Sequence, residues 1–191
     1  MDRAWLNAAN NLEFKDPADY LRGMRQVERI VAGLDLPAKV KALRTNELKE
    51  SRELREAALF CHGMGQRIGQ TVYFAKGESH DYDFVAAWVV GERRCLAPVQ
   101  LKEVVPEEWS SNASLDATIL SLRKYVDSTE LTVAIHVNRT GTFDPGSVRC
   151  KGIGVAALWT FHCCSADQSE WRLWGNFLEE ATPSRFYYPQ D

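Results

Sequence analysis

The N-terminal part of the chain has apolar residues at the spacing of amphipathic helices. Asp16 and Pro17 form a typical helix start, with an acidic cap and a proline in the first turn. Apolar residues recur at helical spacing from there to Gly33, which is expected to end this helix. A second helix is predicted over 37–68, with a break near Thr45 and a middle that is almost entirely charged.

The pattern changes after residue 69, where β-branched and aromatic residues replace the helical spacing. The predicted elements are strands over 71–75, 83–90 and 95–104, a helix over 114–126, and strands over 131–137, 153–163 and 170–177, followed by an extended tail. The strand over 131–137 follows its predecessor through a helix, so the two are expected to be parallel neighbours joined by a right-handed crossover. The sequence therefore predicts an α/β protein with a mixed sheet and helices on its faces.

Length and composition indicate one globular core with an appended segment. The 191 residues are 45% hydrophobic and are enough to bury a sizeable core. We expect an N-terminal helical segment over 1–49 and an α/β core with a C-terminal strand extension over 50–191. The formal net charge of −3 gives no support to a strongly basic, non-specific nucleic-acid binder.

The cysteines and the apolar runs indicate a cytoplasmic protein. Five cysteines without a CxxC motif favour buried, reduced thiols. The longest apolar run is too short to span a bilayer, and the N-terminus has no signal-peptide pattern. A zinc site from Cys150, His162, Cys163 and Cys164 is an alternative without the usual ligand spacing.

The two strands over 83–90 and 95–104 read as a hairpin with polar groups at one end. If the hairpin folds symmetrically about Glu92 and Arg93, Asp83 comes to lie opposite Lys102. Because side chains alternate between faces, Gln100 and Lys102 share one face with Asp83. A carboxylate, an amide oxygen and an ammonium group would then converge, and such a group could hold a divalent metal beside a scissile phosphate.

Each of these side chains suits one part of that chemistry. Magnesium prefers oxygen ligands, which Asp83 would offer as a carboxylate and Gln100 as an amide carbonyl. The backbone carbonyl of Leu101 could supply a further ligand. Lys102 would orient or activate the attacking water and offset the developing negative charge.

A carboxylate of the preceding helix, Glu56 or Glu53, could reach the same end of the sheet. Glu56 is preferred because the apolar residues 57–60 follow it, so it stands where the helix turns from solvated to buried. A solvated helix face with ion pairs is the ordinary alternative for both glutamates. His80 could join a metal shell, whereas His136 is expected to be a satisfied core group.

Taken together, these residues resemble the PD-(D/E)xK nuclease superfamily, which has the restriction-endonuclease-like fold. The resemblance covers about residues 50–138. It implies that the metal-binding acidic residue is Asp83, that the second acidic position falls on Gln100, that the catalytic lysine is Lys102, and that the helix glutamate is Glu56. It also implies a metal-dependent nuclease that uses Mg²⁺ or Mn²⁺ and acts on nucleic acid, with DNA as the expected partner, no membrane partner, and a homodimer as an assembly to consider.

The chain departs from the family pattern in three ways. Gln100 stands where an acidic residue is more common, no proline precedes Asp83, and Pro98 lies inside a strand where it forfeits a ladder hydrogen bond. A catalytically inactive binding or assembly module of the same fold is therefore an alternative function. A third interpretation is an unrelated α+β protein in which Asp83 and Lys102 form an ordinary cross-strand pair.

Overall fold

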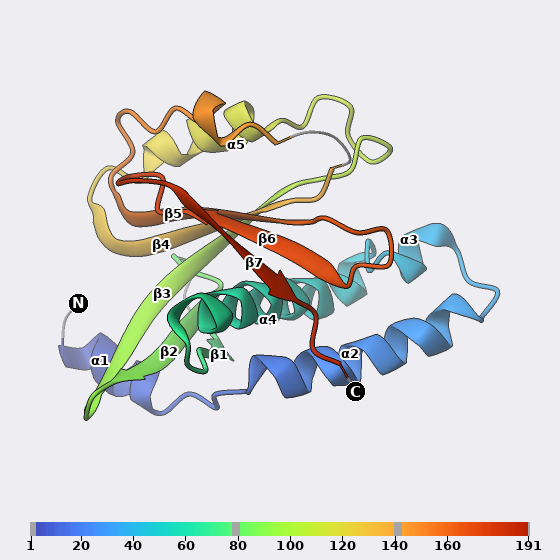
Figure 1. The fold of residues 1–191 in the computed structure, drawn as a ribbon, viewed down its shortest axis with the longest axis horizontal. Coiled ribbons are helices and arrows are strands. Elements are labelled where there is room, and N and C mark those ends of the chain that lie inside the picture. The colour runs from blue at the N-terminus through green and yellow to red at the C-terminus, as the bar shows by residue number, and fades with distance from the viewer. Residues whose placement is uncertain (1–2, 78–80, 140–142, 191) are drawn as a thin grey trace.

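A computed structural model describes residues 3–77, 81–139 and 143–190, in which seven strands form one sheet flanked by helices (Figure 1). The helices are α1 (Arg3–Asn10), α2 (Pro17–Ala32), α3 (Ala38–Lys41), α4 (Lys49–Ile68) and α5 (Leu115–Ser121), with short 3₁₀ turns η1 (Asn46–Leu48), η2 (Leu122–Lys124) and η3 (Pro145–Ser147). The strands are β1 (Tyr73–Lys76), β2 (Phe84–Val90), β3 (Arg93–Val104), β4 (Ser128–Val137), β5 (Val155–Cys163), β6 (Glu170–Gly175) and β7 (Thr182–Tyr187).

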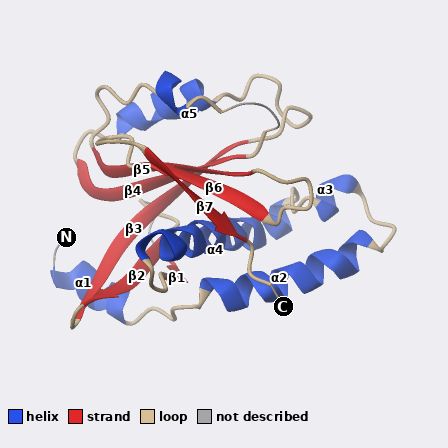
Figure 2. Ribbon diagram, in the orientation of Figure 1, coloured by secondary structure: helices blue, strands red, loops and turns tan. Residues whose placement is uncertain are grey.

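The strands lie in the sheet in the order in which they occur along the chain (Figure 2). The pairs β1–β2, β2–β3, β5–β6 and β6–β7 are antiparallel, whereas β3–β4 and β4–β5 are parallel. The predicted mixed sheet and the predicted parallel neighbours on either side of the α5 crossover are therefore confirmed. The C-terminal tail, predicted to be extended, pairs with β6 as a further strand.

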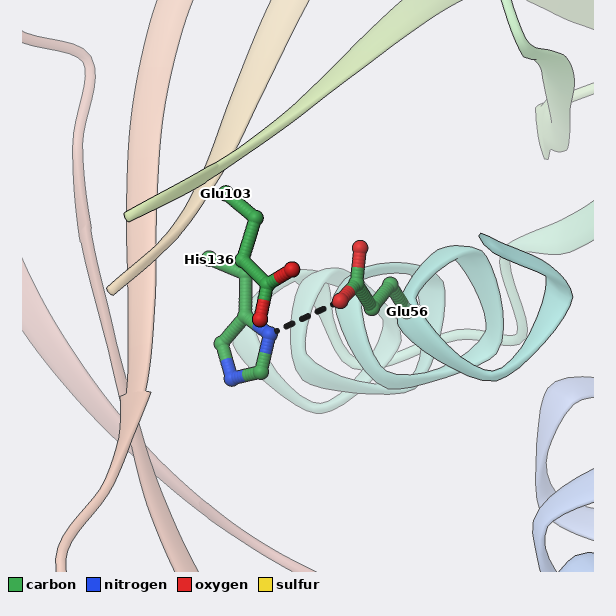
Figure 3. Close-up of side chains that lie close together, drawn as sticks. All are labelled: Glu56, Glu103 and His136. Atoms are coloured by element: carbon green, nitrogen blue, oxygen red, sulfur yellow. Dashed lines mark hydrogen bonds and ion pairs between the residues drawn. The ribbon is translucent and has the colours of Figure 1, made fainter. Parts of the chain in front are cut away.

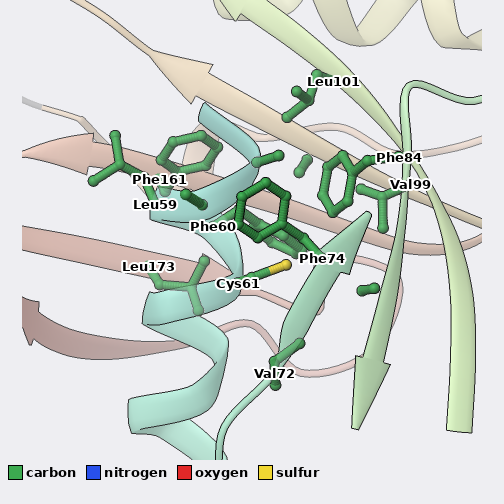
Figure 4. Packing of buried hydrophobic residues seen from close by; sticks show 14 of the residues in the cluster. Leu59, Phe60, Cys61, Val72, Phe74, Phe84, Val99, Leu101, Phe161 and Leu173 are labelled. Atoms are coloured by element: carbon green, nitrogen blue, oxygen red, sulfur yellow. The ribbon is translucent and has the colours of Figure 1, made fainter. Parts of the chain in front are cut away.

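The helices cover both faces of the sheet and create two hydrophobic cores. On one face α4 packs against the sheet with α2 behind it, and on the other face lies α5 (Figure 1). The core under α4 contains large aromatic side chains from α4 and from the strands at both ends of the sheet (Figure 4); its fully buried rings are Phe74, Phe84, Phe161, Trp171 and Phe186. The core under α5 is mainly aliphatic and includes Ile119, Leu122, Val133, Ile135 and Leu158.

The helix boundaries follow the local signals in the sequence. The Asp16 side chain accepts hydrogen bonds from the N–H groups of Ala18 and Asp19, and the helix ends at Gly33, as predicted. The predicted break near Thr45 is confirmed, because α3 and η1 precede α4. The helix over 114–126 is shorter than expected: the α-helix ends at residue 121 and a 3₁₀ turn continues it to residue 124.

The β2–β3 hairpin is confirmed, but its register differs by two residues from the predicted one. Asp83 comes level with Gln100, so the prediction that it lies opposite Lys102 is wrong. The reason is the turn, which uses only two residues and begins with Gly91 at a φ of 61°, a conformation that glycine adopts without a steric penalty. A shift by two keeps every side chain on its predicted face, so Gln100 and Lys102 still share one face.

The remaining global expectations concern the thiols and the membrane. All five cysteines are free, and Cys61 is buried completely in the core under α4, where burial raises the pKa of its thiol. Among the helices that the structure describes, none combines the length and the apolar character needed to cross a membrane.

Two glycines in helices test the close packing of α4. A Cβ added at Gly63 would lie 2.8 Å from the Phe186 ring, which is buried and stacked on Trp171, whereas a Cβ at Gly23 in α2 meets nothing within 4 Å. We expect Gly63→Ala to lower the free energy of unfolding by about 1–3 kcal/mol through overpacking. Gly23→Ala should raise it by about 0.5–1 kcal/mol, because alanine is the better helix former. Chemical denaturation of both variants checks this, and changes of the same sign would contradict the close α4–β7 contact.

Candidate functional site

The Asp83 carboxylate lies directly before the first residue of β2, where β3 continues beyond its pairing with β2. The Asp83 backbone N–H still donates to the Val99 carbonyl oxygen at 2.9 Å, as a ladder bond would. The next ladder position is different, because the Leu101 N–H donates at 2.6 Å to the Asp83 side chain. The carboxylate therefore replaces a backbone acceptor at the end of the hairpin, and this contact fixes its position against β3.

Gln100 contacts the same carboxylate oxygen. Its side-chain amide N–H donates to Asp83 Oδ2, and the Tyr125 hydroxyl donates to its carbonyl oxygen at 3.4 Å. The predicted meeting of Asp83 and Gln100 is thus present in the structure. In this arrangement the amide nitrogen faces Asp83, so Gln100 would offer its oxygen to a cation only after a rotation of the amide.

The charges around Asp83 act in opposing directions. Burial raises the pKa of Asp83, and the negative charge of Glu53 raises it further. The hydrogen bond from Leu101 and the positive charges of Lys102 and Lys49 lower it, but the net pKa stays above the ordinary value. Lys102 is therefore near enough to act on Asp83, although no hydrogen bond or ion pair joins their side chains among the described residues.

A small cleft opens between α4 and the start of β2. It has a volume of about 20 Å³ and is lined by charged and apolar side chains, namely Glu50, Glu53, Leu54, Ala57, Lys76, Asp83, Phe84 and Leu101. Lys76 pairs with Glu50 at 2.8 Å, and Glu53 pairs with the exposed Lys49.

The cleft fits the divalent metal that the resemblance implies. Its volume is that of about one water-sized group. Asp83 and Glu53 offer hard carboxylate oxygens there, and the charge of Glu53 raises the pKa of Asp83. The Leu101 carbonyl oxygen, which accepts a bond of 3.3 Å from Gln100, belongs to the same strand end. Asp83, Glu53 and the Leu101 carbonyl are therefore the groups that would hold such an ion.

Glu56, the preferred helix glutamate, belongs to a different cluster. Its side chain is buried and its Oε1 lies 3.1 Å from Nδ1 of His136, at a position beside Glu103 (Figure 3). The prediction that His136 is a satisfied core group is confirmed, and its ring also stacks on Phe161. The geometry thus favours Glu53, the alternative that the sequence left open, as the helix carboxylate beside Asp83.

Two arginines and an asparagine surround Glu103. The Arg44 guanidinium donates to both of its carboxylate oxygens, and Asn138 donates to one of them at 2.9 Å. The Arg52 guanidinium lies 3.9 Å away. Burial alone would raise the pKa of Glu103, but the hydrogen bonds from Arg44 and Asn138 outweigh it and hold the pKa below its ordinary value.

Histidine, cysteine, aspartate and glutamate are the side chains that commonly bind metals. Among the described residues, one group of three of them has its ligand atoms within 4.8 Å of one another, and it consists of Glu56, Glu103 and His136. They could together hold a metal. However, Arg44 already neutralises Glu103, and a dication would have to displace a guanidinium group that makes two hydrogen bonds there. We therefore assign this cluster to the attachment of α4 and of the segment before it to β3 and β4.

The other sequence candidates lie elsewhere. His80 is outside the described residues. Cys150, His162, Cys163 and Cys164, the alternative zinc ligands, do not form a metal-binding group of three or more among the residues that the structure describes. His162 instead packs against Phe143, and burial together with the charge of Arg172 lowers its pKa to about 4.

Sequence reasoning missed Glu103 and Arg44. Glu103 and His136 occupy paired positions on the parallel strands β3 and β4, so the crossover register was the signal that could have found them. Arg44 reaches Glu103 from the turn after α3, where Leu43 has a positive φ of 54°. No sequence pattern marks that conformation in a leucine.

Comparisons of this chain with protein-family models, with curated proteins and with solved structures found no match. The site geometry and the order of the elements therefore carry the functional argument.

The Glu103 cluster generates a stability prediction with an internal control. Glu103→Gln should lower the free energy of unfolding by about 3–5 kcal/mol, because Arg44 remains charged in a buried place without its anionic partner. Glu50→Gln removes the exposed pair with Lys76 and should cost less than about 1 kcal/mol. Urea denaturation of both variants checks the difference.

The loss of stability caused by Glu103→Gln should depend on pH. The pKa of Glu103 is lower in the folded state than its unfolded value of about 4.5. The ionised Glu103 therefore contributes fully to the free energy of unfolding above pH 4.5, and this contribution is lost as the pH falls through the lower folded-state pKa. The difference in stability between the wild type and Glu103→Gln should therefore narrow in acid. A difference that is constant from pH 7 to pH 3 would contradict the ion pair with Arg44.

Proposed function

We propose that this chain is a metal-dependent nuclease that hydrolyses phosphodiester bonds in DNA at the start of β2. The observation that carries the proposal is the position of the Asp83 carboxylate. It is fixed at the strand end by Leu101, it is bound by Gln100, and it lies within electrostatic range of Lys102 and Glu53.

The order of the elements supports the same proposal. From α4 to β4 the chain runs helix, three antiparallel strands, helix and parallel strand, which is the order that the resemblance implies. The strands β5, β6 and β7 extend the sheet on the far side of β4. The candidate site therefore lies at the open end of the β2–β3 hairpin, away from the turn at Gly91.

Each side chain has a defined task in the proposed reaction. Asp83 and Glu53 would hold the metal, and a bound Mg²⁺ would neutralise charge on the phosphate and lower the pKa of a coordinated water. Lys102 keeps its ammonium group near Asp83, where it can orient the attacking water and offset negative charge that develops on the phosphate. Gln100 positions the Asp83 carboxylate through its amide N–H.

A non-catalytic module of the same fold is the second candidate, and one observation favours it. Gln100 presents its amide nitrogen, and not an oxygen, to Asp83, and both bonds to the carboxylate have an ordinary structural purpose at a strand end. A cytoplasmic location, a nucleic-acid partner and a homodimer stay predictions under either candidate.

The first test of the proposal is a cleavage assay on plasmid and single-stranded DNA with Mg²⁺ or Mn²⁺. We expect metal-dependent cleavage by the wild type and a loss of about a hundredfold or more in Lys102→Ala, because an electrostatic contact to the reacting phosphate is removed. Lys151→Ala is the matched control, since this lysine is exposed in the turn before β5. Equal cleavage by all three proteins would indicate a contaminating nuclease, and no cleavage by any of them would favour the non-catalytic module.

The second test uses Gln100→Glu and does not depend on cleavage. The new carboxylate would lie beside Asp83 and raise its pKa further, so stability should fall as the pH rises through that pKa and should be lower than in the wild type at neutral pH. Added Mg²⁺ should restore it, with a rise in melting temperature of about 2–4 °C for each kcal/mol of metal binding.

Asp83→Asn is the control for this measurement, because asparagine keeps an acceptor for the Leu101 N–H but has no charge. Its melting temperature should not respond to Mg²⁺. A response equal to that of Gln100→Glu would place the metal away from Asp83.

A further inference from the structure

Two lysines stand beside the cleft that contains Asp83, and each of them pairs with a carboxylate of α4. Lys76, the last residue of β1, has its ammonium nitrogen 2.8 Å from a carboxylate oxygen of Glu50. Lys49, the first residue of α4, has its ammonium nitrogen 3.5 Å from a carboxylate oxygen of Glu53. The two lysine side chains are similarly exposed, at 57% and 63%, so they differ mainly in which carboxylate they neutralise.

That difference matters because Glu53 is the helix carboxylate that would hold the metal beside Asp83. Lys49 and the metal therefore need the same carboxylate, whereas Lys76 pairs with Glu50, which has no such task. An exposed ion pair between residues four apart on a helix is weak. A dication has the larger charge, binds carboxylate oxygens directly and repels an ammonium group nearby. We therefore expect Glu53 to exchange Lys49 for the metal, and Lys76 to keep its partner.

The exchange would reverse the sign of the charge in the cleft. When all five side chains are ionised, the carboxylates of Glu50, Glu53 and Asp83 exceed the two ammonium groups by one negative charge. A negative cleft of this kind repels a phosphate. A dication would turn the excess into one positive charge, so a phosphate would be attracted only after the metal is bound.

Lys49 is placed to use this reversal. Its positive charge already acts on Asp83, and its long side chain is flexible and largely solvated. Mg²⁺ that is held by one or two carboxylates commonly takes substrate phosphates as further ligands. A phosphate bound in this way beside Glu53 would lie next to the ammonium group that has just lost that carboxylate.

We propose that the metal gates the binding of the substrate phosphate, because Lys49 leaves Glu53 when the metal binds and then becomes a phosphate-binding residue. The inference rests on the proposed nuclease function and states the order in which its site is filled, with the metal first and the nucleic acid second. By linkage, bound nucleic acid should raise the affinity for the metal by the same factor by which the metal raises the affinity for nucleic acid.

The first measurement is the affinity for Ca²⁺, which takes the same kind of oxygen ligands, by titration calorimetry on the full chain without DNA. Lys49→Met should bind Ca²⁺ about twofold more tightly than the wild type, because no ammonium competes for Glu53. Lys76→Met is the matched control and should change the affinity less. Equal melting temperatures of the three proteins without metal would confirm that both variants keep the fold.

The second measurement is the affinity for a short labelled DNA duplex and for its single strand, by fluorescence anisotropy. In EDTA, Lys49→Met should bind DNA as the wild type does, because Lys49 is then paired with Glu53. In Ca²⁺ it should bind DNA roughly five- to tenfold more weakly, since one phosphate contact is lost. Lys49→Arg should retain most of the wild-type gain, and Lys76→Met should show the same ratio to the wild type in both buffers.

Three results would overturn the inference. The first is an equal loss of DNA binding by Lys49→Met in EDTA and in Ca²⁺, which would mean that no exchange occurs. The second is an equal loss by Lys49→Met and Lys76→Met in Ca²⁺, which would reduce the effect to overall charge. The third is a gain of DNA binding in Ca²⁺ that persists in Asp83→Asn, which would place the metal elsewhere.

The cleavage assay is read separately from these measurements. A chain that shows the exchange at Lys49 but cuts no DNA retains metal-gated phosphate binding and is not a nuclease. A chain that cuts DNA equally well as the wild type and as Lys49→Met, with the same dependence on metal concentration, is a nuclease without this gate.

Discussion

The hydrogen bond from the Leu101 N–H to the Asp83 carboxylate is the contact on which the candidate site depends. β3 extends beyond β2, and from residue 99 onward it pairs with β4 on its other edge. The edge of β3 that β2 no longer covers would leave the Leu101 N–H without an acceptor, which is costly for a buried donor. The carboxylate at 2.6 Å removes that cost, but it must itself be desolvated, and this raises its pKa. One contact therefore satisfies the Leu101 N–H and raises the pKa of the Asp83 carboxyl.

The two acidic centres of this protein show how different neighbours give similar side chains different roles. Glu103 lies between Arg44 and Asn138, and these donors hold its pKa low, so its charge is compensated within the fold. Asp83 has Glu53 as a like-charged neighbour, and the Leu101 N–H and the ammonium groups of Lys102 and Lys49 oppose the rise in its pKa without cancelling it. The fold thus compensates the charge of Glu103 more fully than that of Asp83, which is why the proposed reaction is placed at Asp83.

Much of the fold could be predicted because its signals are local. The cap at Asp16, the periodicity of α2 and the alternation along β4 depend on residues near one another in the sequence. The hairpin register could not be predicted in the same way. A polar turn of several residues admits more than one pairing, and the positive φ of Gly91 selects the two-residue form.

The choice between Glu53 and Glu56 shows a second limit. Three residues apart on a helix, these side chains point only about 60° from each other, so helix periodicity hardly separates them. The two glutamates differ in the residues that surround their side chains. Glu56 lies over β4 and finds His136, whereas Glu53 lies over the start of β2 and shares a cleft with Asp83. Those partners come together only through the α5 crossover and the hairpin, which are long-range features.

The arrangement of groups around Asp83 determines how a substrate must approach. Gln100 and Lys102 share the face of β3 that Val104 presents to the core under α5, and Gln100 contacts Tyr125 there, whereas the cleft with Glu53 belongs to the α4 side. Asp83 contacts both sides because it stands directly before β2 and not within the strand. A phosphate that reached Asp83 would therefore approach along the strand end. With a net charge of −3, the protein has no overall excess of cations that would support many phosphate contacts. In the proposed reaction, affinity would then depend on the metal that the Asp83 and Glu53 carboxylates would hold.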